Sequence, residues 1–125
     1  MLQRFRVTTM LPVVEMSRAR AFYEQQLGLK ATEERPDGKV VYDCAGSLLA
    51  LFPRGTPTKA EHTAISFEVP DVEKMVRDLT ARGVSFEDYD FPGLKTQNKV
   101  CVLGSERAAW FKDSEGNLLC VHQPL

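Results

Sequence analysis

Apolar and polar residues alternate over about seven positions at two places in the chain, ahead of Glu15 and ahead of Asp71. This period of two is typical of a half-buried β-strand. After each acid, apolar residues recur every three or four positions, which is the pattern of an amphipathic helix. Each helical run ends at a glycine, Gly28 or Gly83, a residue suited to the left-handed conformation of a helix C-cap. The apolar helix positions are Ala19, Phe22, Tyr23 and Leu27 in the first run, and Val72, Met75, Val76 and Leu79 in the second.

The two strand–helix runs have the same spacing. Asp71 follows Glu15 by 56 positions and Gly83 follows Gly28 by 55. Each acid stands where a helix N-cap or first turn favours a negative charge. We therefore predict an internal duplication, with the stretch 64–84 repeating the stretch 8–29.

Short strands are predicted after each helix. In the first half they cover 29–34, 39–45 and 47–53, separated by turn signals at 36–38 and 45–46. The second half is expected to repeat this plan with strand 62–69, helix 71–82 and strands 84–89, 108–112 and 117–122. An insertion at 91–107 has no counterpart in the first half, and its residues 100–103 are a candidate short strand. Insertions of this length in small domains are more often functional than neutral.

These elements predict an α+β fold built from two tandem βαβββ modules. We expect a single domain with module one at 1–53, a linker at 54–60 and module two at 61–125. Each helix covers one face of its sheet, so the other face is left free. The two free faces are expected to close around a cleft, giving a half-open, barrel-like sheet.

The alternation on strand 62–69 predicts which side chains line that cleft. Thr63, Ile65, Phe67 and Val69 should face the helix, whereas His62, Ala64, Ser66 and Glu68 should face a wet cavity. The alternative is that this polar set simply faces solvent on an open sheet. If Phe111 faces the helix, its neighbour Trp110 faces the cleft, where it could stack on a planar or cationic ligand or serve only as packing.

Composition and charge exclude several classes of function. The 125-residue chain carries a net charge of −1, which gives no reason to expect a nucleic-acid or membrane-surface partner. No apolar run approaches membrane-spanning length, and the first ten residues lack the apolar core of a signal peptide, so we expect a cytoplasmic protein. The odd cysteine count, without a CxxC pair, suits reduced thiols at Cys44, Cys101 and Cys120.

Three segments of the chain form recognisable motifs. They are Val13-x-Glu15 with Ala19-x-x-Phe22-Tyr23 and Leu27-Gly28; Phe67-x-Val69-x-Asp71-Val72 with Gly83-Val84; and Trp110 to Asn117. In this order they resemble motifs of the vicinal oxygen chelate superfamily, which includes glyoxalase I, extradiol dioxygenases and the bleomycin- and fosfomycin-resistance proteins, with Ser114 where that family usually has proline. The resemblance covers nearly the whole chain except the linker and the insertion. It implies the fold described above and many relatives that pair as dimers, so a homodimer is expected here.

Metal-using members of this superfamily hold a divalent ion with His or Glu on the first and last strands of each module. The matching positions here are Thr8, Ala50, Ala64 and Cys120. Two alanines supply no ligand atoms, and one cysteine cannot build a site alone. The sequence therefore predicts no metal and no cofactor.

The histidines give a weaker alternative, because a two-residue error in this alignment would make His62 a ligand. Strands 62–69 and 117–122 are expected to lie side by side and parallel. With Ala64 and Cys120 level, His62 and His122 would be about 13 Å apart, too far to share an ion. They are interpreted as cavity-lining or surface histidines.

No nucleophile elbow, P-loop or dinucleotide motif is present. Our first hypothesis is a metal-independent protein that binds a small organic ligand, and the alternative is a metal-dependent glyoxalase-like lyase or extradiol dioxygenase. Catalysis without a metal, through Glu68 as a base or through Cys120, is a third possibility. The alternative for Glu68 is a solvated or salt-bridged carboxylate with no catalytic role. Arg107 and Lys95 are candidates to meet an anionic group. The predicted ligand-binding residues are Thr8, Met10, Ala50, Phe52, His62, Ala64, Glu68, Trp110, Cys120 and His122.

Overall fold

The computed structural model describes residues 1–125, and their contacts divide the chain into two compact units. The first unit contains Met1–Lys59 together with Ser114–Gly116. The second contains Ala60–Asp113 and Asn117–Leu125. Three residues from the last hairpin of the chain thus belong to the first unit.

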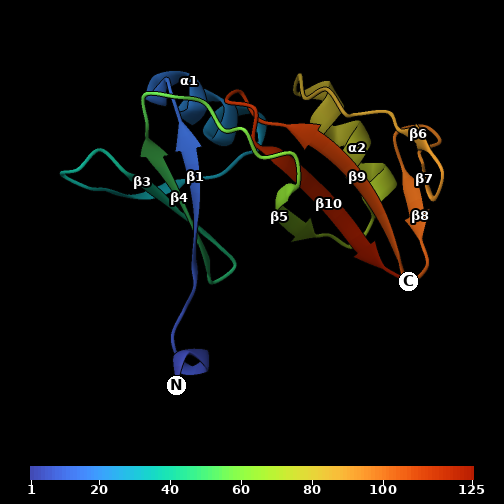
Figure 1. The fold of residues 1–125 in the computed structure, drawn as a ribbon, viewed down its shortest axis with the longest axis horizontal. Coiled ribbons are helices and arrows are strands. Elements are labelled where there is room, and N and C mark those ends of the chain that lie inside the picture. Colours follow the sequence, from blue (N-terminus) through green and yellow to red (C-terminus); the bar gives the residue numbers. More distant parts are fainter. The chain divides into compact units, whose positions relative to one another are not determined.

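The first unit is a four-stranded sheet with one helical segment (Figure 1). Its strand order is β1-β4-β3-β2, with β1 parallel to β4 and the other pairs antiparallel. The buried rings of Tyr23 and Tyr42 stack with centroids 6.1 Å apart, so they join the helical segment to the sheet. Its elements are η1 (Leu2–Arg4), β1 (Thr8–Val13), α1 (Met16–Ala21), the π-helical η2 (Phe22–Gln26), β2 (Ala31–Glu34), β3 (Val40–Cys44) and β4 (Ser47–Pro53).

The second unit repeats this topology with the order β5-β10-β9-β8 (Figure 1). Here β5 is parallel to β10, as expected, and the remaining pairs are antiparallel. The α+β class and the two tandem βαβββ modules are therefore confirmed. Its elements are β5 (Thr63–Glu68), α2 (Val72–Ala81), β6 (Asp90–Phe91), β7 (Leu94–Lys95), β8 (Cys101–Leu103), β9 (Glu106–Lys112) and β10 (Leu118–Pro124).

Helix α2 forms as the sequence predicts. Asp71 is its N-cap, and its carboxylate accepts a hydrogen bond from the Lys74 backbone N–H at 3.0 Å. The amide oxygen of Gln123 accepts a second bond, from the Val72 N–H. Val72, Val76 and Leu79 are buried on its apolar face, and Gly83 follows in the left-handed conformation, with φ 91°.

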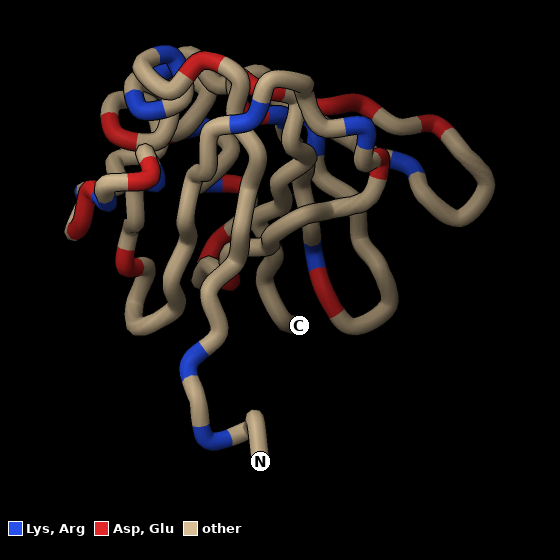
Figure 2. Tube along the Cα trace, turned by 60° about the vertical axis from the view of Figure 1, so that its left-hand side comes forward, with Lys and Arg blue, Asp and Glu red and all other residues tan.

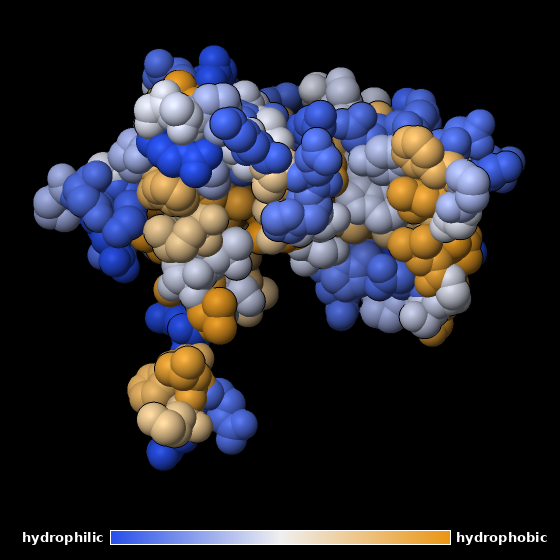
Figure 3. Space-filling model, in the orientation of Figure 1, coloured by the Kyte–Doolittle hydropathy of each residue, from blue (hydrophilic) through white to orange (hydrophobic).

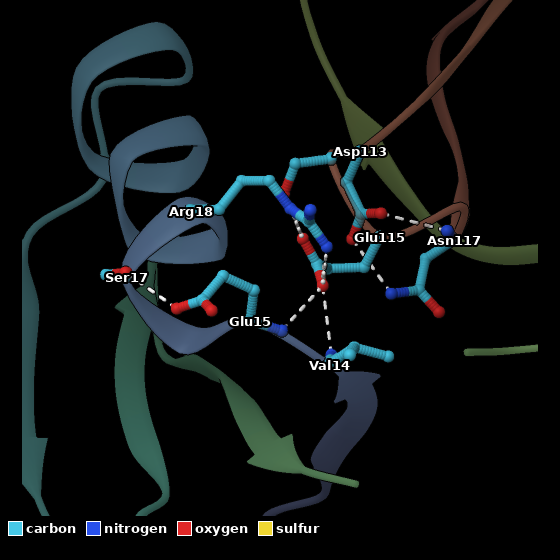
Figure 4. Close-up of polar contacts among 8 residues, drawn as sticks. Val14, Glu15, Ser17, Arg18, Asp113, Glu115 and Asn117 are labelled. Atoms are coloured by element: carbon cyan, nitrogen blue, oxygen red, sulfur yellow. Dashed lines mark hydrogen bonds and ion pairs between the residues drawn. The ribbon is translucent and has the colours of Figure 1, made fainter. Parts of the chain in front are cut away.

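Helix α1 begins differently from its repeat. Glu15 is at the N-cap position, but its side chain makes no capping bond and instead accepts one from the Ser17 hydroxyl. The cap comes from Glu115, whose Oε1 accepts hydrogen bonds from the N–H groups of Val14 and Glu15 at 2.9 and 3.0 Å (Figure 4). A carboxylate at this end also matches the positive end of the helix dipole.

The strand predicted at 84–89 is wrong. Only one bridge forms there, between Phe86 and Phe111. The fourth strand of the second sheet is β8, which comes from the predicted insertion and confirms the candidate strand at 100–103. The outer edge of β9 is divided, because β8 pairs with its first part and the 86–87 segment meets only its later part, where Glu87 N–H donates to the Trp110 carbonyl. Too few backbone groups of β9 remain free to pair with residues 84–89 as a strand.

The orientation predicted for Thr63 is also wrong. The pairing of β5 with β10 shifts between Leu118 and Leu119, so that Thr63 lies opposite Leu118 but Ile65 lies opposite Leu119. This β-bulge leaves Ala64 as an extra residue. Thr63 therefore turns to the side of the sheet that carries Trp110, and its hydroxyl accepts a hydrogen bond from the indole. Ile65, level with the buried Phe111, keeps its predicted place.

Charges of both signs are spread along the chain, and exposed apolar side chains gather at the N-terminus. Basic and acidic residues are interspersed along the trace (Figure 2), as expected for a net charge of −1. The N-terminal segment carries apolar side chains open to solvent beside hydrophilic ones (Figure 3), and Met1, Leu2, Phe5 and Val7 are all at least 70% exposed. No helix is both long and apolar enough to span a membrane.

Candidate functional site in the second unit

One face of the second sheet gathers most of the chemistry-bearing residues that the sequence singles out. Residues directly opposite one another on paired strands share a face. Cys120 lies opposite both Trp110 and Ser66, and His122 lies opposite Glu68 and Ala108. The other face, which carries Phe111 and Leu119, belongs to the buried core. We call the first of these the Trp110 face. Its members are Thr63, Ser66, Glu68, Cys101, Ala108, Trp110, Leu118, Cys120 and His122.

Trp110 lies across this face. Its indole Nε1 donates to Thr63 Oγ1 at 3.1 Å, which takes the side chain from β9 past β10 to the edge strand β5. The residue is 9% exposed and packs with the buried Cys101, Ala108 and Cys120. An indole whose N–H is already bonded is oriented by that bond.

A polar group lies beside the indole on the same face. The Ser66 hydroxyl is 2.5 Å from His122 Nδ1, and His122 Nε2 is 3.9 Å from a Glu68 oxygen. Ser66 and Glu68 are exposed and His122 is half-buried. The group can therefore exchange hydrogen bonds with a ligand that reaches it. The His–Glu separation is too long for a hydrogen bond.

The Cys120 thiol is not an activated nucleophile. Burial raises the pKa of Cys120, and this effect outweighs the hydrogen bond from Ser66, which lowers it. The thiol is therefore protonated at neutral pH. Burial also raises the pKa of Cys44, and all three cysteines are free.

Residues 87–103, which span the end of the predicted strand 84–89 and much of the predicted insertion, cover part of the Trp110 face. Tyr89 packs on Trp110 edge to face, with ring centroids 5.5 Å apart and an interplanar angle of 69°. Leu94 and Leu103 pack against the same cluster. The segment is tied to the sheet by the bond from Glu87 N–H to the Trp110 carbonyl, 2.7 Å long. The insertion therefore contributes side chains to the site.

The first sheet carries four of the predicted ligand-binding residues on one face. Met10 lies opposite Ala50, and Phe52 lies opposite Pro12, so Thr8, Met10, Ala50 and Phe52 point to the same side. Ala50 is 1% exposed, whereas Met10 is 44% exposed and Thr8 is open to solvent. This surface is apolar, with one hydroxyl.

The side chains at the superfamily's metal positions do not fit a divalent ion. Thr8, Ala50 and Ala64 offer at most one weak oxygen ligand, and no group of three or more His, Cys, Asp or Glu side chains could hold a metal anywhere in residues 1–125. His122 is level with Glu68 at one end of β5, and His62 precedes the other end, so the histidines are separated as expected. The prediction that Ala64 lies opposite Cys120 is wrong, because Cys120 lies opposite Ser66.

The remaining candidate residues lie elsewhere. Arg107 pairs with Glu73 of α2 at 3.1 Å, and its neighbour Ala108 faces the other way, so the guanidinium lies on the helix side of the sheet. Lys95 is exposed beside Asp90. Sequence reasoning missed Thr63 because of the bulge, and it missed Tyr89 because the predicted strand 84–89, which contains Tyr89, does not form. Ser66 could have been chosen, since the alternation of strand 62–69 already put it with Glu68.

Comparison with solved structures shows the same fold at low sequence identity. The fosfomycin resistance protein FosX from Listeria monocytogenes matches with a TM-score of 0.77 and 15% identity, over 100% of this chain and 94% of that chain. Lactoylglutathione lyase from Agrobacterium tumefaciens matches with a TM-score of 0.68 and 19% identity, over 95% and 92%. TnmS3, an antibiotic-binding protein from a Streptomyces species, matches with a TM-score of 0.65 and 19% identity, over 97% and 96%.

At this level of identity the solved structures show only the fold, so the family is assigned from the sequence. No curated protein sequence matches the chain significantly. The sequence model of one superfamily does match, and it spans residues 6–121, which includes both repeats and the insertion. The chain therefore belongs to the glyoxalase/bleomycin resistance protein/dioxygenase superfamily.

Proposed function

We propose that this protein binds a small organic molecule on the Trp110 face without using a metal ion. The observation that carries the proposal is the indole of Trp110, fixed by its bond to Thr63 beside the Ser66–His122 pair. An oriented aromatic surface next to a few polar groups is the usual make-up of a small-molecule site. The ligand would combine an apolar ring or chain with at least one hydrogen-bonding group.

The donor set argues against the metal-dependent alternative. A lyase or dioxygenase of this superfamily needs His or Glu where this chain has alanine, and the two histidines are at opposite ends of β5. Neither Cys120, which is protonated, nor the exposed Glu68 supports covalent or acid–base chemistry. Binding without reaction is the function that these residues support best.

The solved relatives are consistent with binding by this fold. TnmS3 is an antibiotic-binding protein, and we propose binding of a small molecule here as well, without its conversion. The face of the first sheet with Thr8, Met10, Ala50 and Phe52 is the second candidate ligand surface. We also propose that the protein acts in the cytoplasm.

A thermal-shift screen with small organic compounds, with and without EDTA, tests the proposal. A compound that binds only the folded state raises the melting temperature, and at one hundred times its Kd the gain is about 2.7 kcal/mol. EDTA should leave this gain unchanged. The variant His122→Ala should weaken binding of a hit, whereas Glu61→Ala, which alters an exposed residue ahead of β5 outside the predicted ligand-binding set, is the control.

Two results would reverse this conclusion. If the purified protein retains a stoichiometric divalent metal and EDTA lowers its melting temperature, the lyase or dioxygenase alternative is favoured. If hits bind equally well to wild type and to His122→Ala, the ligand does not occupy the Trp110 face.

A further inference from the structure

A tyrosine just ahead of the insertion places its ring on the side chain that the proposed ligand would need. Tyr89 is half-buried and meets Trp110 edge to face at 5.5 Å. The rest of the cluster around the indole is aliphatic or a thiol. Aromatic rings in contact favour this geometry over saturated groups of similar size, because the ring edge is positive and the ring face negative.

The segment that carries Tyr89 is held mainly by its own short-range bonds. Tyr89 and Thr96 exchange backbone and hydroxyl hydrogen bonds, with the Tyr89 N–H donating to Thr96 Oγ1 and the Thr96 N–H donating to the Tyr89 carbonyl, each at 2.9 Å. Its two-residue strands β6 and β7 pair only with each other. Displacement of Tyr89 with these bonds kept therefore requires Leu94, which packs against the same cluster, to move with it.

The backbone at the far end of this segment is strained. Asn98 and Lys99 have φ values of 52° and 72°, and a left-handed conformation is unfavourable for a lysine. Lys99 is held there by an ion pair with Asp88, 2.5 Å long. Strained residues that sit between two anchored parts are places where a small change of conformation re-aims a loop.

We propose that Tyr89 occupies the ligand position on Trp110 in the free protein, and that the ligand is a flat aromatic compound whose ring displaces the tyrosine. This inference rests on the proposed function and adds the class of ligand and the residue that selects for it. A saturated compound of the same shape gains less from the indole, because it cannot reproduce the edge-to-face contact it would have to replace.

The test uses 2-naphthol and its saturated counterpart, decahydro-2-naphthol, with binding measured by isothermal titration calorimetry, because 2-naphthol itself absorbs and emits light in the tryptophan range. Wild type should bind 2-naphthol in preference to the saturated compound. Tyr89→Ala should bind 2-naphthol roughly three- to tenfold more tightly, because the competing ring is gone.

Two variants keep the test interpretable. Tyr89→Phe retains the ring and should behave like wild type, which separates displacement of the ring from loss of the hydroxyl. Val102→Ala, at an exposed position of β8 within the insertion, is the matched control and should leave the affinity unchanged. If Tyr89→Ala does not fold, hydrogen exchange of residues 87–100 in wild type replaces it, and 2-naphthol should speed that exchange.

The outcomes distinguish this inference from the function beneath it. Equal binding of the two naphthol compounds, or unchanged affinity in Tyr89→Ala, overturns the role of Tyr89 but leaves small-molecule binding intact. Slower exchange of residues 87–100 on addition of 2-naphthol also overturns it, because the ligand would then pack under the segment. Absence of any ligand in the thermal-shift screen removes the function itself.

Discussion

At the scale of single residues, Glu115 shows how a buried charge is stabilised in this protein. Its carboxylate is inaccessible to solvent and accepts hydrogen bonds from two backbone N–H groups, from Nε and Nη2 of Arg18, and from the Ser114 hydroxyl (Figure 4). The bond from Arg18 is the largest cause that lowers the pKa of Glu115, which falls to about 2 even though burial opposes the shift. The charged form is the stable one.

Replacing Glu115 should therefore cost stability in a pH-dependent way. At pH 7, Glu115→Gln should lower the free energy of unfolding by about 2 kcal/mol, the loss of charge-assisted hydrogen bonds. Because the folded pKa is about 2 and lies below the ordinary carboxyl value, this stabilisation is full above about pH 4.5 and is lost as the pH falls toward 2. Urea unfolding of wild type and variant at pH 7 and pH 3 measures both.

The control for this prediction is Glu33→Gln, which removes an exposed carboxylate paired with Arg35. Its effect should stay within about 0.5 kcal/mol at either pH. A difference between wild type and Glu115→Gln that is the same at pH 3 as at pH 7 would show that Glu115 is not the ionised cap described above.

At the scale of elements, the two repeats differ in how their helices begin. Asp71 caps α2 through its own side chain, whereas Glu15, at the equivalent place in α1, bonds only to Ser17. Equivalent residues in the two halves therefore have different roles, and sequence position alone does not reveal it.

Alanine at these two positions should separate the roles. Asp71→Ala should lower the free energy of unfolding by about 1 kcal/mol, the usual effect of losing an N-cap. Glu15→Ala should change it by less than about 0.5 kcal/mol, since the cap from Glu115 remains. Chemical denaturation of both variants provides the comparison, and equal losses would mean that Glu15 caps α1 after all.

The sequence predicted those elements whose side chains follow one period throughout. Apart from strand 84–89, the strands and helices of both repeats, their order and the two C-cap glycines are confirmed, because burial against a core imposes periods of two and 3.6. Strand 84–89 failed because alternation describes burial and not backbone pairing, and its neighbour on β9 is taken by β8. The bulge at Ala64 does not change the pattern of apolar and polar residues, so the face on which the Thr63 side chain lies could not be predicted.

The candidate site could be predicted where its residues lie on regular strands, but not where it depends on an irregular segment or on strand register. Trp110, Cys120, His122 and Glu68 share a face because alternation on β5, β9 and β10 says so. Tyr89 could not be placed, since it lies at the end of the predicted strand 84–89, which does not form. The bond between Ser66 and His122 depends on the register of the parallel strands β5 and β10. The sequence predicts Ala64 opposite Cys120, whereas the structure has Ser66 there, two positions further along β5.

At the scale of the whole molecule, the edges of the two sheets remain to be accounted for. β1 ends the order of the first sheet and β5 ends that of the second. Edge strands with free backbone groups are sites of pairing unless they are covered. Met10, on β1, leaves an apolar side chain 44% exposed. We propose on these grounds that the protein is a homodimer that covers its edge strands.

Light scattering after size exclusion should give about 28 kDa, which is twice the chain mass of 14.1 kDa. Met10→Lys should shift the protein toward the monomer, because a charge on an edge strand opposes pairing. Val14→Lys is the control, since Val14 is also 44% exposed but lies just beyond β1. A mass near that of one chain at every concentration would contradict the dimer.

The position of Glu115 has a consequence for the history of the chain. A repeated gene segment ordinarily leaves each copy self-sufficient, so that either can be lost, moved or fused elsewhere. Here the opening helix of the earlier copy depends on a carboxylate encoded a hundred codons later, in the hairpin of the other copy. Once that bond was in place, selection could no longer treat the halves as separable, and a half-length gene would encode a protein whose first helix lacks its cap.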